Sequence, residues 1–269
     1  MESALDYWTA KALLDWQIEM GADEAIQDKT VNRYELAGTA PRSADAPQEV
    51  TPQPPTDAPR AEPGSAPPPV DAIAAAREAA RAAQDLAGLR AAMADFDHCD
   101  LKAGARNLVF ADGIAGAPVM ILGEAPGRDE DREGLPFVGR AGQLLDRMLA
   151  AIDRGRDRTE APVYITNILP WRPPQNRTPD KTEIAMMLPF VERHIQMAAP
   201  KILVLMGNTP CQALLGRSGI TRMRGHWARA LDLPVLPMFH PAYLLRTPAA
   251  KREAWADLLT LRARLKDPT

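Results

Sequence analysis

Four polar motifs contain the residues of this sequence whose types and spacing could do chemistry. They are GEAPG at 123–127, TNILPWRPPQNRTP at 166–179, MGNTP at 206–210 and FHPAYLLR at 239–246. The first is followed by the charged run RDEDRE at 128–133 and then by Phe137. Each motif begins where an apolar run ends, which is where open α/β sheets carry their binding side chains.

Each of these residues also has a purely structural explanation. The carboxylates of 128–133 would be favoured at a helix N-terminus by the helix dipole, and Phe137 alone would be a core residue. Asn167 suits a turn, but its carboxamide also offers a donor and an acceptor side by side, which can read the edge of a pyrimidine. His240, directly before a proline, could fill a polar corner.

The elements that must position these residues are visible as apolar runs and helical periods. Strands are predicted at 118–122, 163–167, 201–206 and 234–239, and helices at 141–153, 181–198, 208–215 and 249–265. Short, nearly continuous apolar strands that alternate with helices indicate a parallel sheet covered on both faces. We therefore predict a three-layer α/β/α domain with a central four-stranded parallel sheet.

The N-terminal part of the chain differs in composition. Apolar residues at helical spacing predict an amphipathic helix at 3–20, within a segment 1–36 that could pack on the body or bind a protein partner. Ten prolines between 37 and 70 predict a disordered linker. Asp71 is the expected N-cap of an Ala-rich helix that runs to about Ala94 and opens a domain at 71–269.

Composition limits the class of protein. The net charge of -3 argues against an unselective polyanion binder, so contacts to DNA would have to be local. The two cysteines form neither a disulfide framework nor a metal-binding pair. Because the sequence has no secretory leader and no apolar run long enough for a membrane span, we expect a monomeric cytoplasmic protein with no metal.

Three long segments in this order resemble the uracil-DNA glycosylase superfamily, and most closely its family 4. They are GEAPGRDEDREGLPFVGRAGQLLDRML at 123–149, VYITNILPWRPPQNRTP at 163–179 and HPAYLLR at 240–246. The resemblance extends over 85–262 and includes NLVFADG and RMRGHW. It implies a base-excision repair enzyme that flips uracil out of DNA and hydrolyses its N-glycosidic bond, leaving an abasic site.

The resemblance also implies roles for individual residues. Phe137 would stack on uracil, a contact typically worth about 1–3 kcal/mol, and Asn167 would bond the N3–H and O4 edge. His240 would act as a fixed neutral donor to O2 as negative charge develops there. Further contacts to the base or the attacking water would come from Gly123, Glu124 and Ala125.

The partner of the attacking water is left open by the resemblance. Better-studied superfamily members carry an aspartate directly after the position of Glu124, whereas this chain has Ala125. Glu130 is our first choice, because it lies in the turn that also delivers Phe137, and Glu124 is the alternative. We expect Glu130→Ala to lose activity and Glu124→Gln to be milder.

Contacts to DNA are expected from the last motif and from nearby basic residues. Leu244 matches the apolar wedge that enters the space left by the flipped base, and Tyr243 and Leu245 flank it. Candidate phosphate contacts, each of which could equally be plain surface residues, are Arg172, Arg222, Arg224, His226 and Arg246. The loop 170–181 lacks the histidine with which a related branch traps DNA covalently, so a monofunctional enzyme that turns over is expected.

Family 4 enzymes usually hold a [4Fe–4S] cluster through four cysteines. The matching positions here are Phe96, Cys99, Trp171 and Met187. Because one thiolate cannot hold the cluster, we expect no cofactor, with Trp171 and Met187 filling the vacated volume by apolar contacts and Phe96 available to join them.

Two other functions remain as alternatives. The position that excludes the methyl group of thymine by bulk in the best-known relatives is Gly127 here, so a same-fold glycosylase for hypoxanthine or xanthine is one. A non-catalytic DNA-binding adaptor is the other, although the joint presence of Phe137, Asn167 and His240 speaks against it.

Overall fold

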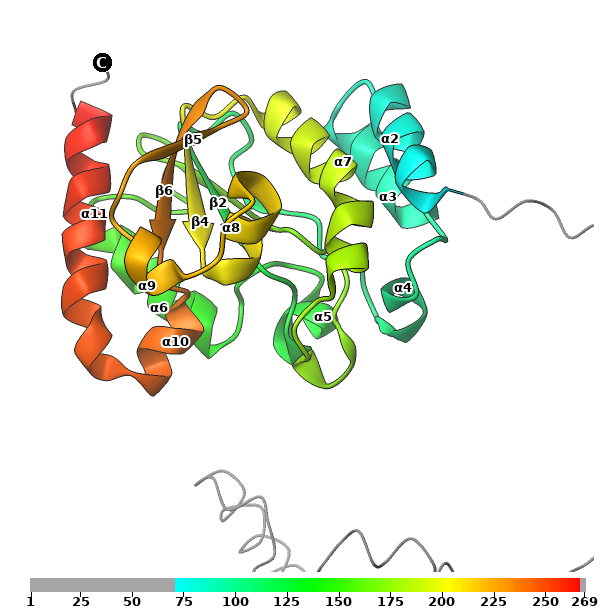
Figure 1. Ribbon diagram of the computed structural model, residues 1–269. Helices are drawn as coiled ribbons and strands as arrows, with labels where there is room; N and C mark the ends of the chain where they lie inside the picture. Colours follow the sequence, from blue (N-terminus) through cyan, green and yellow to red (C-terminus); the bar gives the residue numbers. More distant parts are fainter. Residues whose placement is uncertain (1–70, 267–269) are drawn as a thin grey trace, which may run out of the picture. The chain divides into compact units, whose positions relative to one another are not determined.

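The computed structural model describes residues 71–266, so the predicted helix at 3–20 and the linker at 37–70 lie outside the described residues. A sheet lies between layers of helices (Figure 1). Its strands are β1 (Asp112–Gly113), β2 (Val119–Gly123), β3 (Val163–Asn167), β4 (Ile202–Met206), β5 (Ala228–Ala230) and β6 (Leu233–Met238). The α-helices are α2 (Ala72–Ala82), α3 (Leu86–Asp95), α4 (Leu101–Gly104), α5 (Arg128–Glu133), α6 (Arg140–Ala150), α7 (Lys181–Ala198), α8 (Asn208–Leu215), α9 (Ile220–Met223), α10 (Pro241–Arg246) and α11 (Lys251–Lys266), with 3-10 turns η2 (Pro174–Asn176) and η3 (Pro248–Ala250).

The strand order is β1-β3-β2-β4-β6-β5. The four inner strands run parallel, which confirms the predicted parallel core of an α/β fold. The edge strands β1 and β5 pair antiparallel with β3 and β6, and the sequence reading missed both. Strands of two and three residues are too short to show an apolar period of their own.

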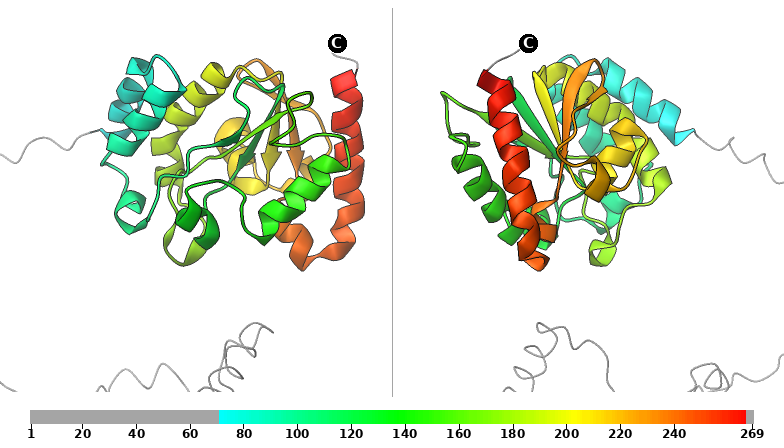
Figure 2. Two further views of the ribbon diagram at one scale, coloured as in Figure 1. Left: turned by 180° about the vertical axis from the view of Figure 1, so that it is seen from behind. Right: turned by 60° about the vertical axis from the view of Figure 1, so that its left-hand side comes forward.

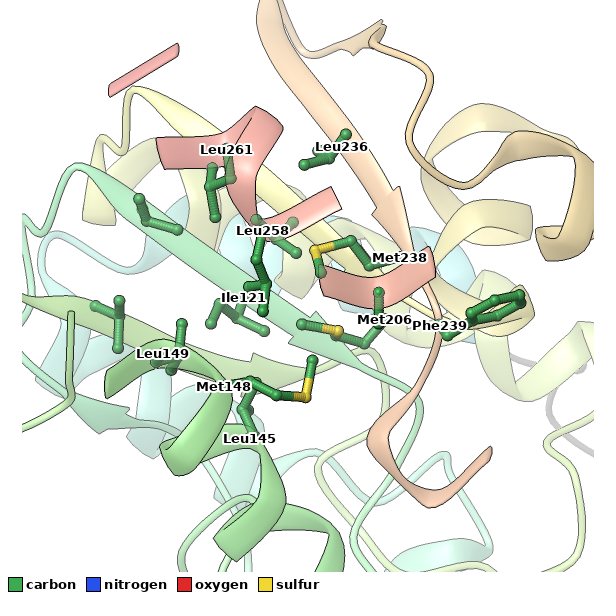
Figure 3. Close-up of a cluster of buried hydrophobic side chains, with 14 of the residues drawn as sticks. Ile121, Leu145, Met148, Leu149, Met206, Leu236, Met238, Phe239, Leu258 and Leu261 are labelled. Atoms are coloured by element: carbon green, nitrogen blue, oxygen red, sulfur yellow. The ribbon is translucent and has the colours of Figure 1, made fainter. Parts of the chain in front are cut away.

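Alternation along the inner strands builds a core on each face of the sheet. In β2, Val119 and Ile121 join one cluster while Met120 and Leu122 join the opposite one, as the two-residue period of a strand requires. Side chains of α6 and α11 complete the first cluster, part of which is drawn in Figure 3. Side chains of α7 and α8 complete the second. The two helix layers are seen on either side of the sheet in Figure 2.

The Ala-rich region corrects one prediction, because it forms two helices rather than one. Asp71 caps α2 as expected, accepting from the backbone N–H groups of Ile73 and Ala74. The chain then breaks at 83–85, where Asp85 adopts an extended conformation and accepts from Gly88 N at 2.7 Å to cap α3. An Asp side chain that bonds a nearby amide competes with helix continuation. Both helices pack on α7.

The parallel register brings the ends of the inner strands to one edge. Gly123 pairs with Asn167 across β2 and β3, and Met206 pairs with Met238 across β4 and β6. The four polar motifs follow these ends, so they converge at the carboxyl edge of the sheet. None of the helices within 71–266 combines the length and the apolar character needed to cross a bilayer.

Candidate active site

A pocket of about 610 Å³ opens at the carboxyl edge of the sheet, within the size range of small-molecule sites. All four polar motifs contribute to its wall. The lining residues are Glu124, Ala125, Pro126, Gly127, Glu130, Phe137, Ala141, Asn167, Pro173, Asn176, Arg177, Thr178, Met206, Gly207, Asn208, Thr209, Ile220, Phe239, His240, Ala242, Tyr243 and Arg246. The structure therefore brings together most of the residues that the sequence selected.

Two aromatic rings form one wall of the pocket. The rings of Phe137 and His240 stack with centroids 5.4 Å apart and an interplanar angle of 28°. Phe137 has a positive φ of 55°, a left-handed conformation that disfavours a non-glycine residue by about 1–2 kcal/mol. The surrounding contacts therefore hold this residue in a conformation that it would not adopt alone, with its ring at the pocket.

Asn167 presents an unpaired carboxamide beside this ring. It ends β3, is 7% exposed, and makes no side-chain hydrogen bond to any residue of 71–266. A β-carbon at Gly123 would lie 2.3 Å from Asn167 Oδ1 and 2.6 Å from Phe137 Cζ. Gly123 is not on the pocket wall; instead, its missing side chain gives Asn167 and Phe137 the space to close in. The expectation that Gly123 contacts the base directly is thus replaced by this role.

His240 is held as a neutral ring with one defined tautomer. It is the N-cap of α10, and its Nδ1 accepts a hydrogen bond from Ala242 N at 3.2 Å, which leaves the proton on Nε2. Burial, together with the smaller effect of the Arg246 charge, lowers the pKa of His240 to about 4. The ring is therefore an uncharged N–H donor at neutral pH.

Glu124 lies at the mouth of β2 and is held by a residue from another motif. Thr209, on α8, donates from its hydroxyl to Glu124 Oε2 at 2.5 Å. Thr209 is 5% exposed, so this bond is sheltered from water. The neighbouring Asn208 accepts from the backbone N–H groups of Gly219 and Ile220 and ties the next loop to the same edge.

Glu130 has a structural task as well as a place on the pocket wall. Its Oε2 accepts from Gly127 N at 3.1 Å, and its Oε1 accepts from Val138 N at 3.1 Å and Gly139 N at 2.9 Å. Gly127 and Gly139 are the N-caps of α5 and α6. A carboxylate has about four acceptor positions, so three are used and one on Oε2 remains for a ligand.

The predicted wedge residue is wrong. Leu244, on α10, is 1% exposed and packs in the core against α6 and α11. On a short helix that begins at Pro241, position 244 points inward because the apolar core covers that face. Its neighbours Tyr243 and Leu245 are only partly buried, and Tyr243 lines the pocket.

The candidate phosphate-binding residues divide into internally bonded and exposed groups. Arg224 donates from Nε to Asp257 Oδ2 at 2.8 Å and from Nη2 to the backbone oxygen of Glu253 at 2.9 Å. Asp257 is 1% exposed, so Arg224 neutralises a buried carboxylate and its assignment to a phosphate is wrong. Arg222, His226 and Arg246 are exposed, and Arg246 borders the pocket. Arg172 donates to Asn176 Oδ1 at 2.7 Å and is not among the residues that line the pocket.

Sequence reasoning gave no role to five polar residues of the pocket wall, which are Asn176, Arg177, Thr178, Asn208 and Thr209. Thr209 had a weak signal, since MGNTP was selected as a strand-end motif without a role for the threonine. Asn176 lies in the loop after β3, with a positive φ of 54°, and nothing in its local sequence indicated that it faces the same pocket as Glu130.

The sequence also matches a known protein family. The model of the Uracil DNA glycosylase superfamily matches residues 110–259, more than half of the chain. The chain belongs to this superfamily. The matched span contains β2 to β6 and the whole pocket wall, so family membership rests on the part of the chain that builds the site.

The chain is also similar in sequence to individual glycosylases. The chain is 36% identical over 173 residues to a type-4 uracil-DNA glycosylase of Sulfurisphaera tokodaii, covering 61% of this chain and 77% of that protein. It is 36% identical over 170 residues to that of Archaeoglobus fulgidus, covering 59% and 82%, and 37% identical over 153 residues to that of Thermotoga maritima, covering 55% and 77%. All three relatives are type-4 uracil-DNA glycosylases.

The four positions that match the iron–sulfur ligands of family 4 lie in one hydrophobic cluster. Phe96, Cys99, Trp171 and Met187 are each at most 5% exposed. The Phe96 ring meets Phe190 edge-on, with centroids 5.3 Å apart. Burial raises the pKa of the Cys99 thiol, and a cluster ligand must be a thiolate. Three apolar side chains and one protonated thiol do not fit a [4Fe–4S] cluster.

Proposed function

We propose that this superfamily member is a monofunctional uracil-DNA glycosylase of base-excision repair. The observation that carries the proposal is the joint placement of the open carboxamide of Asn167, the buried Phe137 ring and the neutral His240 in one pocket. The three groups provide, in turn, selection of the base, a surface for its ring and a donor for the developing negative charge. The type-4 uracil-DNA glycosylases among the relatives support the same function.

Selection of uracil follows from the hydrogen-bonding pattern of Asn167. Uracil presents a donor at N3 and an acceptor at O4, which complement Oδ1 and Nδ2 of the carboxamide. Cytosine presents an acceptor and an amine donor at these positions, so its pattern is reversed. Because Asn167 makes no side-chain hydrogen bond within 71–266, a mismatched base that covered the carboxamide would leave its polar atoms unsatisfied, at about 1–3 kcal/mol for each group.

Cleavage of the N-glycosidic bond leaves negative charge on the departing base. The Nε2–H of His240 can donate to uracil O2 as this charge grows, and the hydrogen bond from Ala242 N already fixes the ring. A donor that is oriented before the reaction lowers the barrier without reorganisation. Since burial keeps His240 neutral, we infer that it acts as a hydrogen-bond donor and not as a proton source.

The attacking water would be bound by a carboxylate at the pocket wall. Glu130 remains our first choice, because one acceptor position of its Oε2 is free while the other three hold it rigidly. Glu124 is the alternative, with Oε2 already bonded to Thr209. Glu130 is also near the N-termini of α5 and α6, so its loss would disturb the loop that carries Phe137.

The remaining features concern DNA, cofactor and location. We propose that Tyr243 and Leu245 enter the duplex in place of the buried Leu244, and that Arg222 and Arg246 contact phosphates. The apolar side chains at three of the four ligand positions support a protein without an iron–sulfur cluster. We also propose that the protein acts on DNA as a monomer in the cytoplasm. Residues 1–36 would bind a protein partner.

A cleavage assay tests the function. Full-length protein is incubated with duplex and single-stranded oligonucleotides that carry one uracil, thymine or hypoxanthine, followed by alkali to cut abasic sites. Free uracil and strand cleavage only at uracil are expected. Preferential cleavage at hypoxanthine would replace the substrate, and binding without cleavage of any substrate would favour the adaptor.

A further inference from the structure

Arg156 lies outside the pocket wall but contacts the backbone of the residue that forms it. It follows α6, in the loop that leads to β3, and its side chain is only 11% exposed. Its Nη1 donates to the carbonyl oxygen of Pro136 at 3.1 Å, and its Nη2 donates to the carbonyl oxygen of Phe137 at 3.0 Å. Two successive carbonyls of the loop between α5 and α6 are therefore held by one guanidinium.

Two carboxylates hold the same guanidinium from the other side. Arg156 Nη1 lies 2.5 Å from Asp112 Oδ2, and Arg156 Nε lies 3.0 Å from Asp146 Oδ1. Asp112 comes from the edge strand β1 and Asp146 from α6, so the guanidinium is anchored to two separate elements. A planar guanidinium can satisfy acceptors in fixed directions, which a lysine ammonium cannot reproduce.

The held residue needs such support. Phe137 has a positive φ, and its ring stacks on His240. Helix α6 packs closely against the backbone of Phe137, since a β-carbon at Gly142 would lie 1.7 Å from the Phe137 carbonyl oxygen. Without Arg156 the two carbonyls would lose their donors and the unfavourable backbone conformation could relax, which would move the ring.

We propose that Arg156 is a positioning residue for uracil excision that acts through Phe137, with Asp112 and Asp146 holding it in place. This inference rests on the proposed function, because the effect is read as the rate of uracil release. Arg156 touches neither the pocket nor the reacting atoms, so its effect should depend on the presence of the Phe137 ring.

A double-mutant cycle tests this dependence. Single-turnover rates of uracil release are measured for full-length parent, Arg156→Lys, Phe137→Ala and the double variant. We expect Arg156→Lys to slow the parent at least 10-fold, since a misplacement of about 1 Å can lower a rate ~100-fold. In the Phe137→Ala background the same change should alter the rate less than about 2-fold, because the ring is already gone.

A matched control and a milder variant complete the design. Arg262→Lys changes an arginine paired with Asp153 at 3.5 Å on the surface, and its rate should equal that of the parent. If Arg156→Lys does not fold, Asp146→Asn replaces it in the same cycle. The Asp146 side chain is 47% exposed, so we expect this variant to slow uracil release about 3-fold. Equal losses with and without Phe137, or no loss with it, would overturn the inference. A parent that releases no uracil would overturn the proposed function instead.

Discussion

The ring of Phe137 stacks on the ring of His240 with 5.4 Å between their centroids. The two residues come from different loops at the carboxyl edge of the sheet, one after β2 and one after β6. The wall that would receive the base is therefore formed before any ligand arrives. Preorganisation of this kind reduces the ordering that binding must supply.

The two pocket carboxylates should differ in their effects. Glu130→Ala removes the acceptor of three backbone N–H groups as well as the free acceptor position, so the single-turnover rate should fall at least ~100-fold and the melting temperature should also fall. Glu124→Gln keeps an oxygen for the Thr209 hydroxyl and should be milder. The measurements are single-turnover excision and thermal unfolding. If Glu124→Gln is the more damaging change, the water partner is Glu124.

The apolar residues of α10 should separate DNA distortion from core packing. Leu244→Ala removes a side chain that is 1% exposed, so it should lower the free energy of unfolding by about 2–5 kcal/mol. Tyr243→Ala should slow excision from duplex DNA more than from single strands, because only the duplex resists flipping. Chemical denaturation and paired duplex and single-strand assays check these outcomes. An equal effect of Tyr243→Ala on both substrates would exclude its insertion.

Stability should depend on pH through His194. This residue is 3% exposed and bonded to Tyr164 Oη at 2.9 Å, and burial lowers its pKa to about 4. Below pH 6.5 the unfolded imidazole gains a proton that the folded one does not, so this contribution to stability is present above pH 6.5 and is lost as pH falls toward 4. Relative to His194→Gln, the parent should lose an additional ~1.4 kcal/mol per pH unit in this window. An equal change in the free energy of unfolding between pH 6.5 and 4.5 for the two proteins would contradict this prediction.

The protein should be active without iron. Purified protein is expected to be colourless and to contain less than stoichiometric iron, and a chelator should change neither the excision rate nor the melting temperature. The reason is the apolar packing of Phe96, Trp171 and Met187 around the single Cys99 thiol. Metal analysis and absorbance spectroscopy provide the test. Four iron atoms per chain with a charge-transfer absorbance would contradict this expectation.

Local patterns in the sequence predicted the elements that depend on local chemistry. The apolar runs marked the four inner strands, and α7 begins where Asp180 and Glu183 form reciprocal capping bonds. The resemblance to a family then identified Phe137, Asn167 and His240 as neighbours. Asn167 ends an inner strand and the other two follow such ends, so the sheet topology brings the three residues together.

Long-range packing explains what the sequence did not predict. Leu244 was expected to be the wedge that enters DNA, but its orientation depends on how α10 packs against α6 and α11. Arg224 was expected to face DNA, whereas its partner Asp257 is 33 residues further along the chain. Thr209 and Arg156 act through contacts with Glu124 and Phe137 that no local spacing reveals.

The most direct test of the central claim is single-turnover excision of uracil from a duplex oligonucleotide by the full-length parent, Asn167→Ala and His240→Ala. The parent should release free uracil and leave thymine untouched. Loss of the carboxamide should slow release about 10- to 100-fold, and loss of the oriented imidazole should slow it about 100- to 1000-fold. Uracil release at the parental rate by both variants, or no release by the parent, would contradict the account.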